Sequence, residues 1–442
     1  AAALCWRRNI LPAARERAAQ LGLRGAAFPW RTIAGRECSG YWPAGTAAFH
    51  VNADVADAVA RYLHATGDEA FGRGTGLELA VETARLWRSL GHHGHDGRFH
   101  IDGVTGPDEY SALADDNLYT NLMAQANLRL AADLADRFPA EAEALGVDDE
   151  ETAAWRDAAD AVNLPFNPRL GVHEQAAGFT GHQRWDFAAT GPECYPLLLH
   201  FPYVDLYRKQ VVKQADLALA LYLRGEAFSE EQKAADFSYY EELTVRDSSL
   251  SAAVQAVVAA ELGHLRLAYD YLAEAALIDL DDLQHNSRDG LHLASLAGAW
   301  TALVAGLGGF RLGPGAPAFA PRLPPELSSL CFRLRLRGRT LRVRAVQGSA
   351  EYLVQEGGSL TVRHFGEELR LEPGRPETRP VPPAPARPEP VQPQGRRPAR
   401  RGGPLPDGSW DGDGSADRFT GPEQGKAARD RGIRAGERKG TR

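Results

Sequence analysis

Apolar side chains recur every three or four positions over most of the first 312 residues. In residues 48–66, for example, Val51, Val55, Val59 and Leu63 lie on one face of a predicted helix. This spacing is typical of amphipathic helices packed against a core. Helix follows helix without intervening buried strands, which favours an array of helical hairpins over a doubly wound sheet. The helices predicted in this way span residues 48–66, 77–90, 117–138, 149–162, 204–223, 248–262, 265–277 and 291–304.

The pattern changes at Gly313, after which apolar and charged residues alternate. The stretches that begin at Cys331 and Thr340 read Cys-Phe-Arg-Leu-Arg-Leu-Arg and Thr-Leu-Arg-Val-Arg-Ala-Val. Alternation of this kind is typical of half-buried strands. We therefore predict a mainly α domain over residues 1–312 and a small antiparallel β module over residues 313–371.

The last part of the chain has a different composition. From residue 372 onward Pro, Arg, Gly, Glu and Asp dominate, and apolar periodicity is almost lost. Such a segment buries too little apolar surface to offset the chain entropy that folding removes. We expect residues 372–442 to be disordered. The run Arg-Arg-Pro-Ala-Arg-Arg within it could bind an anion, although a solvated tail is the more common structure for a charge run.

Composition narrows the class of protein. Of the 442 residues 44% are hydrophobic and 24% are charged, as in ordinary globular domains. The formal net charge of −8 argues against general nucleic-acid binding. No apolar run is long enough to predict a membrane span, and the first residues do not resemble a secretion signal. The four cysteines are scattered, as is typical of reduced thiols, so we expect a cytoplasmic location.

An acidic turn at residues 99–110 is the strongest candidate for catalysis. Its sequence, Phe-His-Ile-Asp-Gly-Val-Thr-Gly-Pro-Asp-Glu-Tyr, brings Asp102, Asp108 and Glu109 into one loop held by Gly and Pro. Like charges in a partly desolvated pocket raise the pKa of one carboxyl, which can then act as a general acid near neutral pH. The alternative is an acidic surface turn without a catalytic role.

Three further loops offer donors to an oxyanion. Lys213 and Gln214 supply a point charge and a neutral amide. The loop Arg246-Asp247-Ser248-Ser249 precedes a predicted helix, where free N–H groups favour an anion, although Asp247 and Ser248 are also ordinary helix caps. A third loop, residues 285–292, again precedes a helix.

A cluster of histidines, residues 92, 93 and 95, invites a metal interpretation. Its spacing matches no zinc pattern, and we expect no metal and no cofactor.

Several motifs together resemble glycoside hydrolase family 65, which includes maltose, trehalose and kojibiose phosphorylases. They are HIDGVTGPDEY, DDNLYTNLMAQANL, KQADLALALYL, YYEELTVRDSSLS and RDGLHLASLAGAW, and they occur in consistent order between about residues 11 and 371. The resemblance implies an (α/α)6 barrel followed by a small β-sandwich. It implies Glu109 as the general acid and a set of residues around the sugar and phosphate: Lys213, Gln214, Ser248, Ser249 and His292, with Trp42 and Asn117 at the border of the sugar pocket.

The resemblance also has departures. Family members begin with a large N-terminal β-sandwich and the first barrel helices, so the barrel in this chain is expected to be incomplete and to start near the third or fourth helix. Many relatives have His at the position of Arg246.

The function that the resemblance implies is inverting disaccharide phosphorolysis. An α-glucoside of the maltose, trehalose or kojibiose type would react with inorganic phosphate as co-substrate to give β-glucose 1-phosphate. An α-glucoside hydrolase on the same scaffold and an inactive truncated family member are the alternatives. Family members commonly form dimers, so the resemblance also allows a homodimer.

Overall fold

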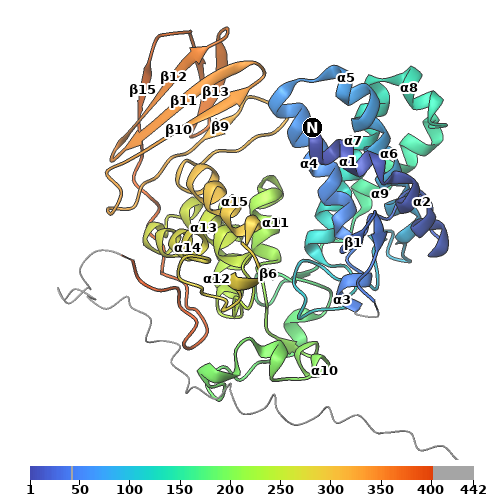
Figure 1. The fold of residues 1–442 in the computed structure, drawn as a ribbon, viewed down its shortest axis with the longest axis horizontal. Helices are drawn as coiled ribbons and strands as arrows, with labels where there is room; N and C mark the ends of the chain where they lie inside the picture. Colours follow the sequence, from blue (N-terminus) through green and yellow to red (C-terminus); the bar gives the residue numbers. More distant parts are fainter. Residues whose placement is uncertain (41–42, 402–442) are drawn as a thin grey trace, which may run out of the picture.

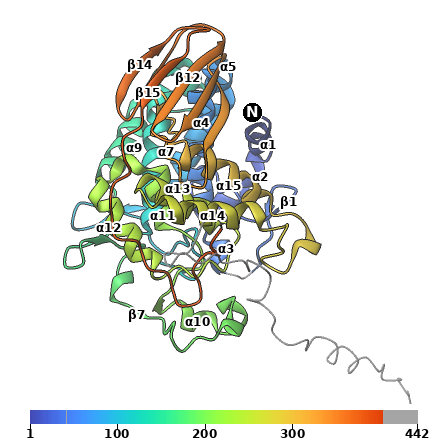
Figure 2. The same ribbon diagram turned by 90° about the vertical axis from the view of Figure 1, so that its left-hand side faces the viewer.

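Two groups of helices and a β domain make up the molecule (Figures 1 and 2). The computed structural model describes residues 1–40 and 43–401. Chain order places the first group of helices before residue 162. Its members are α1 (Ala2–Asn9), α2 (Leu11–Gln20), α3 (Pro43–Thr46), α4 (His50–Thr66), α5 (Glu69–Phe71), the π-helical turn η1 (Gly72–Gly76), α6 (Leu77–Leu90), α7 (Leu118–Arg137), α8 (Pro139–Ala144) and α9 (Asp149–Ala161).

The second group follows a long irregular stretch. It consists of α10 (Tyr203–Leu206), α11 (Leu217–Leu223), α12 (Glu230–Glu241), α13 (Ser251–Glu261), α14 (Leu265–Leu277), α15 (Leu293–Thr301) and the π-helical turn η7 (Ala302–Leu307). Short strand pairs fasten the loops of both groups. They are β1 (Thr32–Ile33) with β2 (Arg36–Glu37), β3 (His92–His93) with β4 (Phe99–His100), β5 (Phe166–Asn167) with β6 (Val172–His173), and β7 (Gln183–Arg184) with β8 (Lys209–Gln210).

Helix α7 joins the two groups. It packs against α4, α6 and α9 of the first group and against α11 of the second. Asn117 caps its first turn by accepting a hydrogen bond from Thr120 N (2.9 Å), as the polar residue before the apolar run predicts. Leu122 and Leu128 are among its fully buried side chains, and burying each leucine stabilises the fold by roughly 1.5–3 kcal/mol. The helical hairpins therefore share one continuous core.

The predicted helix over residues 204–223 is wrong. The structure has α10 and α11 there, separated by β8 and by an irregular stretch that ends at Asp216. The backbone of this stretch hydrogen-bonds elsewhere: Val212 N donates to Leu243 O (2.9 Å) and Lys213 N donates to Asp108 Oδ1 (2.8 Å). These long-range partners replace the local bonds of a helix. Helix α12 and the two N-terminal helices α1 and α2 were not among the predicted helices.

The β domain is built from two sheets that share a core. One has the order β10-β11-β12-β15 and the other β14-β13-β9. The predicted alternation is present, because Leu334, Val343 and Tyr352 point inward from adjacent strands. One pair differs from the antiparallel prediction, since β9 runs parallel to β13. The strands are β9 (Ala318–Phe319), β10 (Ser329–Leu336), β11 (Arg339–Val346), β12 (Ser349–Glu356), β13 (Leu360–His364), β14 (Glu367–Leu371) and β15 (Glu377–Pro380).

The structure differs from the expected disordered tail over residues 372–401. Strand β15 pairs with β12, and residues 381–401, here called the C-terminal strap, continue from it along the second helix group. Apolar periodicity contributes little to the stability of the strap. Its prolines restrict the unfolded chain, which lowers the entropy cost of ordering it, and its arginines contact acidic residues: Arg387 with Glu230, Arg396 with Asp247 and Arg401 with Asp281. The Arg-Arg-Pro-Ala-Arg-Arg run lies at the end of the strap, and residues 402–442 lie outside the described part.

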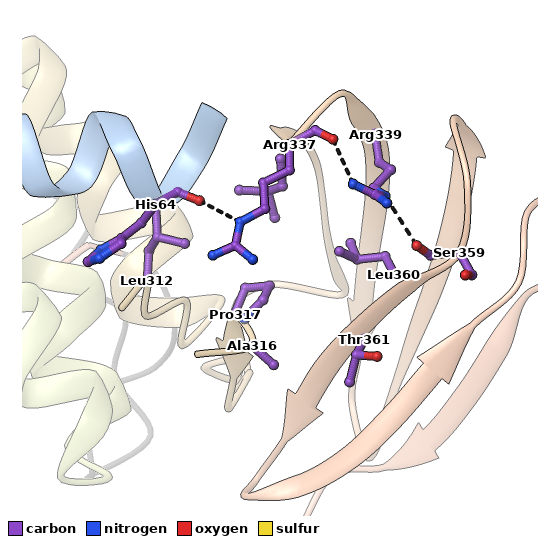
Figure 3. A pocket seen from close by; sticks show the side chains of 10 residues that line it. His64, Leu312, Ala316, Pro317, Arg337, Arg339, Ser359, Leu360 and Thr361 are labelled. Atoms are coloured by element: carbon purple, nitrogen blue, oxygen red, sulfur yellow. Dashed lines mark hydrogen bonds between the residues drawn. The ribbon is translucent and has the colours of Figure 1, made fainter. Parts of the chain in front are cut away.

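The β domain meets the helices at the end of α4. Arg337 lies in the turn between β10 and β11, and its backbone N donates to Ala65 O (2.6 Å). Its Nε donates to His64 O (3.0 Å), while Arg339 donates to the carbonyl of Arg337 (2.8 Å), as Figure 3 shows. A cavity of about 290 Å³ lies at this junction. A second cavity, of about 790 Å³, is lined by α4, α11 and the linker before β9. No helix among the described residues is long and apolar enough to cross a membrane.

Candidate active site

The loop between β4 and α7, residues 101–116, is here called the acid loop. Asp116 fastens its two ends. One carboxylate oxygen accepts from Ile101 N (3.3 Å) and from Asn121 Nδ2 (3.0 Å), and the other lies 2.7 Å from His100 Nδ1. Rigid anchoring of this kind is what a catalytic loop requires, because its side chains must be held in place before substrate binds.

Glu109 is the acid-loop residue that the structure places opposite a cation. Its side chain is nearly buried, at 11% exposure, and its carboxylate contacts the Lys213 ammonium. Asp102, from the same loop, is half exposed and lies 3.7 Å from His92 Nδ1. The acidic residues of the turn therefore differ in environment, and Glu109 is the one that faces the lysine.

Two buried carboxyls support this contact from behind. Asp216 Oδ2 accepts a hydrogen bond from Asp108 N (3.2 Å), and Asp108 Oδ1 accepts from Lys213 N (2.8 Å). Gln175 donates to the other oxygen of Asp108 (2.9 Å). A Cβ at Gly106 would come within 2.3 Å of Asp216, so only glycine fits at this point of the loop.

Burial makes these two carboxyls easier to protonate. Desolvation raises the pKa of Asp108 to about 6, and desolvation together with the charge of Asp108 raises the pKa of Asp216 to about 7. Within the acidic turn the pKa is also raised at Asp102, by burial and by the charge of Asp115. Asp216 was not a predicted site residue, although it ends the same Lys-Gln-Ala-Asp motif.

The lysine loop, residues 211–216, lies directly against the acid loop. Besides the contact between Lys213 and Glu109, the Gln214 amide donates to Pro107 O. Ala215 N donates to Ser251 Oγ (3.3 Å), which ties the lysine loop to the start of α13. The structure therefore brings together the predicted acid and the first predicted pair of donors, although 104 positions separate Lys213 from Glu109.

The serine loop, residues 245–250, holds Ser248 and Ser249, both half-buried. Neither Asp247 nor Ser248 caps α13, because the helix begins at Ser251 and Leu250 occupies its N-cap position. The Asp247 carboxylate instead accepts from Tyr110 Oη (2.7 Å) and from Leu197 N (2.7 Å). Since Tyr110 follows Glu109 in the chain, Asp247 links the serine loop to the acid loop.

Arg246 lies beside these serines but points away from them. Its guanidinium pairs with Glu274 (2.9 Å) and packs over the Tyr271 ring. Its backbone has φ of 56°, a left-handed conformation that costs a non-glycine residue free energy. This strain sets the turn that leads into Ser248 and Ser249.

Three predicted site residues remain, namely His292, Asn117 and Trp42. His292 precedes α15, and its Nδ1 lies 2.6 Å from Asp279 Oδ1, so it belongs to a separate cluster. Asn117 is 1% exposed, and its amide donates to Gln175 O (3.1 Å) and to Asp216 Oδ2 (3.2 Å). These contacts make Asn117 a support of the acid loop. Trp42 lies outside the described residues.

No group of three or more His, Cys, Asp or Glu side chains among residues 1–40 and 43–401 is arranged to hold a metal ion. His93 instead pairs with Asp157 (3.1 Å). Acid-loop residues line neither of the two cavities at the domain junction. The acid, lysine and serine loops therefore lie outside both cavities.

Comparisons with known proteins agree with this architecture. The model of the glycosyl hydrolase family 65 central catalytic domain matches residues 1–301, and that of the C-terminal domain of the same family matches residues 310–371. An uncharacterized glycosyl hydrolase of Mycobacterium leprae is 56% identical over 402 residues, covering 90% of this chain and 50% of the relative. The α,α-trehalose phosphorylase of Thermoanaerobacter brockii is 41% identical over 383 residues, 84% of this chain and 50% of that protein.

A solved structure has the same arrangement. A putative kojibiose phosphorylase from the human microbiome superposes with a TM-score of 0.78 at 27% identity, covering 85% of this chain and 56% of that one. The chain therefore spans about half the length of the curated relatives that it matches.

Proposed function

The chain belongs to glycosyl hydrolase family 65, and from this premise we propose that its site catalyses inverting phosphorolysis of an α-glucosyl disaccharide. The products would be β-glucose 1-phosphate and the released sugar. The relative that is 41% identical is named α,α-trehalose phosphorylase, which makes trehalose the first substrate to test.

One observation carries the proposal, namely that Glu109 and Lys213 meet on facing loops. Cleavage of a glycosidic bond requires an acid that protonates the leaving oxygen. Phosphorolysis also requires cationic and neutral donors that hold phosphate as the nucleophile. Glu109 is suited to the first task, and Lys213 with the hydroxyls of Ser248 and Ser249 in the serine loop to the second.

The contact between Glu109 and Lys213 also suggests how phosphate binding affects the acid. In the described structure the Lys213 ammonium is engaged by the Glu109 carboxylate. A bound phosphate would compete for this ammonium, because its charge is greater than that of a carboxylate. When Lys213 turns to phosphate, the Glu109 carboxyl loses this contact and is left facing the leaving sugar.

Hydrolysis on this scaffold is the second candidate. An inverting hydrolase needs a carboxylate base that activates water on the face opposite the acid. Asp108 and Asp216, the carboxyls behind Glu109, are both buried and engaged by hydrogen-bond donors. This arrangement favours phosphate over an activated water as the nucleophile.

The test is release of glucose 1-phosphate from trehalose, maltose, kojibiose and nigerose, each with and without inorganic phosphate. Phosphate-dependent product from one sugar supports phosphorolysis and identifies the linkage. Glucose released at the same rate without phosphate supports the hydrolase instead. If neither product forms from any sugar, this chain is an inactive member of the family and the proposal fails.

A further inference from the structure

The C-terminal strap runs along α12 and approaches the serine loop. Near the start of α12, Arg387 donates to Glu230 (2.7 Å). At the other end of α12, Gln392 donates to Glu241 Oε2 (3.1 Å). Pro385 passes so close to Gly263 that a Cβ at this glycine would lie 2.6 Å from the Pro385 carbonyl oxygen. The strap is therefore docked along its length, and it follows a single path toward the serine loop.

Arg396 is the strap residue that reaches this loop. Its guanidinium donates to Asp247 Oδ1 (3.0 Å), and its Nε donates to Val245 O (2.7 Å). The guanidinium also lies over the Tyr195 ring, 4.4 Å from the ring centre. Arg396 is mostly buried, and Asp247 is almost completely so, with its side chain 1% exposed. This is an enclosed ion pair with directed hydrogen bonds rather than a surface contact.

The buried carboxylate that Arg396 contacts is a junction between loops. One of its oxygens accepts from Tyr110 Oη and from Leu197 N, both at 2.7 Å. Tyr110 Oη in turn accepts from Leu198 N (3.0 Å). Asp247 thus holds the acid loop at Tyr110, the residue that follows Glu109 in the chain. It also immediately precedes Ser248 and Ser249.

A carboxylate in this environment needs a cation. Burial raises the pKa of Asp247, and the charge of Arg396 opposes that effect. Removing the partner of a buried charge is costly, because the remaining charge can regain neither water nor a counter-ion. The neighbouring Arg246 does not take this place, because its guanidinium pairs with Glu274. Within the described residues, Arg396 is the cation in hydrogen-bond contact with Asp247.

We propose that Arg396 is a positioning residue, and that through Asp247 the C-terminal strap fixes both the acid at Glu109 and the serine loop that receives phosphate. The inference rests on the proposed function of these two loops. It assigns the strap to the support of the active site, although 149 positions separate Arg396 from Asp247. Arg396 acts on the reaction only through Asp247 and the backbone of Val245.

The test compares three variants of the full chain. Arg396→Ala removes the cation, and Arg396→Lys keeps the charge but loses the planar donors. Arg387→Ala breaks the strap's ion pair with Glu230 at the start of α12, away from the serine loop. For Arg396→Ala we expect a lower kcat and a higher KM for phosphate, so that kcat/KM for phosphate falls on the order of tenfold. The KM for the disaccharide should stay within twofold. Arg396→Lys should recover part of the loss, and Arg387→Ala should match the parent chain.

Hydrogen exchange gives a readout that does not depend on activity. Arg396→Ala should increase amide exchange in peptides covering residues 105–110, 195–198 and 245–250, whereas Arg387→Ala should increase it only near residues 381–390. Kinetics for Arg396→Ala within twofold of the parent chain, or an equal loss in Arg387→Ala, would overturn the inference.

The failure of the proposed function is distinguishable from this result. If the parent chain releases no glucose 1-phosphate, the function fails and exchange alone decides whether Arg396 positions the loops. Unchanged exchange in the three loop peptides of Arg396→Ala then overturns the inference, and selective loosening of these peptides supports it.

Discussion

The acid loop, which holds Glu109, and helix α15, which follows His292, both lie at predicted site residues, but their surroundings are opposite. Glu109 is nearly buried and rests on Asp108 and Asp216, which are themselves buried and hydrogen-bonded. Near His292, by contrast, Leu293 is 72% exposed and Trp300 is 52% exposed. A single surface apolar residue is ordinary, but an apolar helix face in contact with water is not.

The difference shows which part of the site is self-supporting. Asp108, Asp116 and Asp216 each accept hydrogen bonds from other segments of this chain, so the acid loop is held by contacts within the chain. Helix α15 packs only one side, where Ser295 donates to Ala275 O (3.1 Å) and Gly298 lies close to Ala253. The apolar side chains on its other side, such as Leu293 and Trp300, are exposed to solvent. Variants can test each half of this comparison.

The largest effect is expected at the acid. Glu109→Gln removes the proton donor with almost no change in shape, and we expect the rate of glucose 1-phosphate release to fall at least about a hundredfold. Asp102→Asn changes an exposed carboxyl of the same loop and should leave the rate within about twofold. A Glu109→Gln variant that keeps its full rate would contradict the assignment of the acid.

The next effect is expected at the lysine that faces the acid. Lys213→Ala should raise the KM for phosphate and lower kcat/KM for phosphate about ten- to thirtyfold, because a charge-assisted contact is lost. Ser249→Ala should change the same parameter in the same direction. Lys209→Ala, which removes an exposed ammonium bonded to Gln183, is the matched control. Steady-state kinetics with phosphate varied would show the contrast, and a defect confined to the sugar KM would contradict it.

A buried position on α13 and an exposed position on α15 should also differ in how much a substitution lowers the free energy of unfolding. Val258 on α13 is 1% exposed, and Val258→Ala should lower the free energy of unfolding by about 2 kcal/mol through lost burial and a residual cavity. Leu293→Ala on α15 should change it by less than about 0.5 kcal/mol, because that side chain already contacts water. Urea unfolding of both variants measures this difference. Equal losses would show that α15 is covered in solution.

The last expected effect is a dependence of stability on pH. Asp108 and Asp216 keep their protons to a higher pH in the fold than in the unfolded chain, where the pKa of an Asp carboxyl is about 3.8. The stability of the parent chain should therefore fall as pH rises from about 4 to about 7. In Asp216→Asn the fall should end near pH 6, where Asp108 has titrated, so the variant should lose less stability than the parent chain between pH 4 and pH 7.

Urea unfolding at stepped pH tests this prediction. Asp160→Asn, a change of an exposed carboxyl on α9, serves as the control. A curve for Asp216→Asn that follows the parent chain up to pH 7 would contradict the assigned burial effect.

The amino-acid sequence by itself determined the local structure and the identity of the chemical groups. Helical periodicity identified α4, α6, α7, α9 and α14 to within a few residues, and alternation identified β10 and β11. Turn residues and acidic side chains marked Glu109, and the family resemblance supplied its role. These features depend on residues near one another in the chain, so a local pattern carries them.

Only the tertiary structure decided which of these groups meet. Residues 204–223 have a helical pattern, yet long-range hydrogen bonds to Asp108 and Leu243 open a loop in their middle. Residues 381–401 lack apolar periodicity, yet their arginines pair with acidic residues of the helical domain, among them Arg396 with the buried Asp247. The contacts of Lys213 with Glu109 and of Arg396 with Asp247 bridge 104 and 149 positions. No local pattern encodes such pairs, because their free energy arises from burial and charge that exist only once the chain has folded.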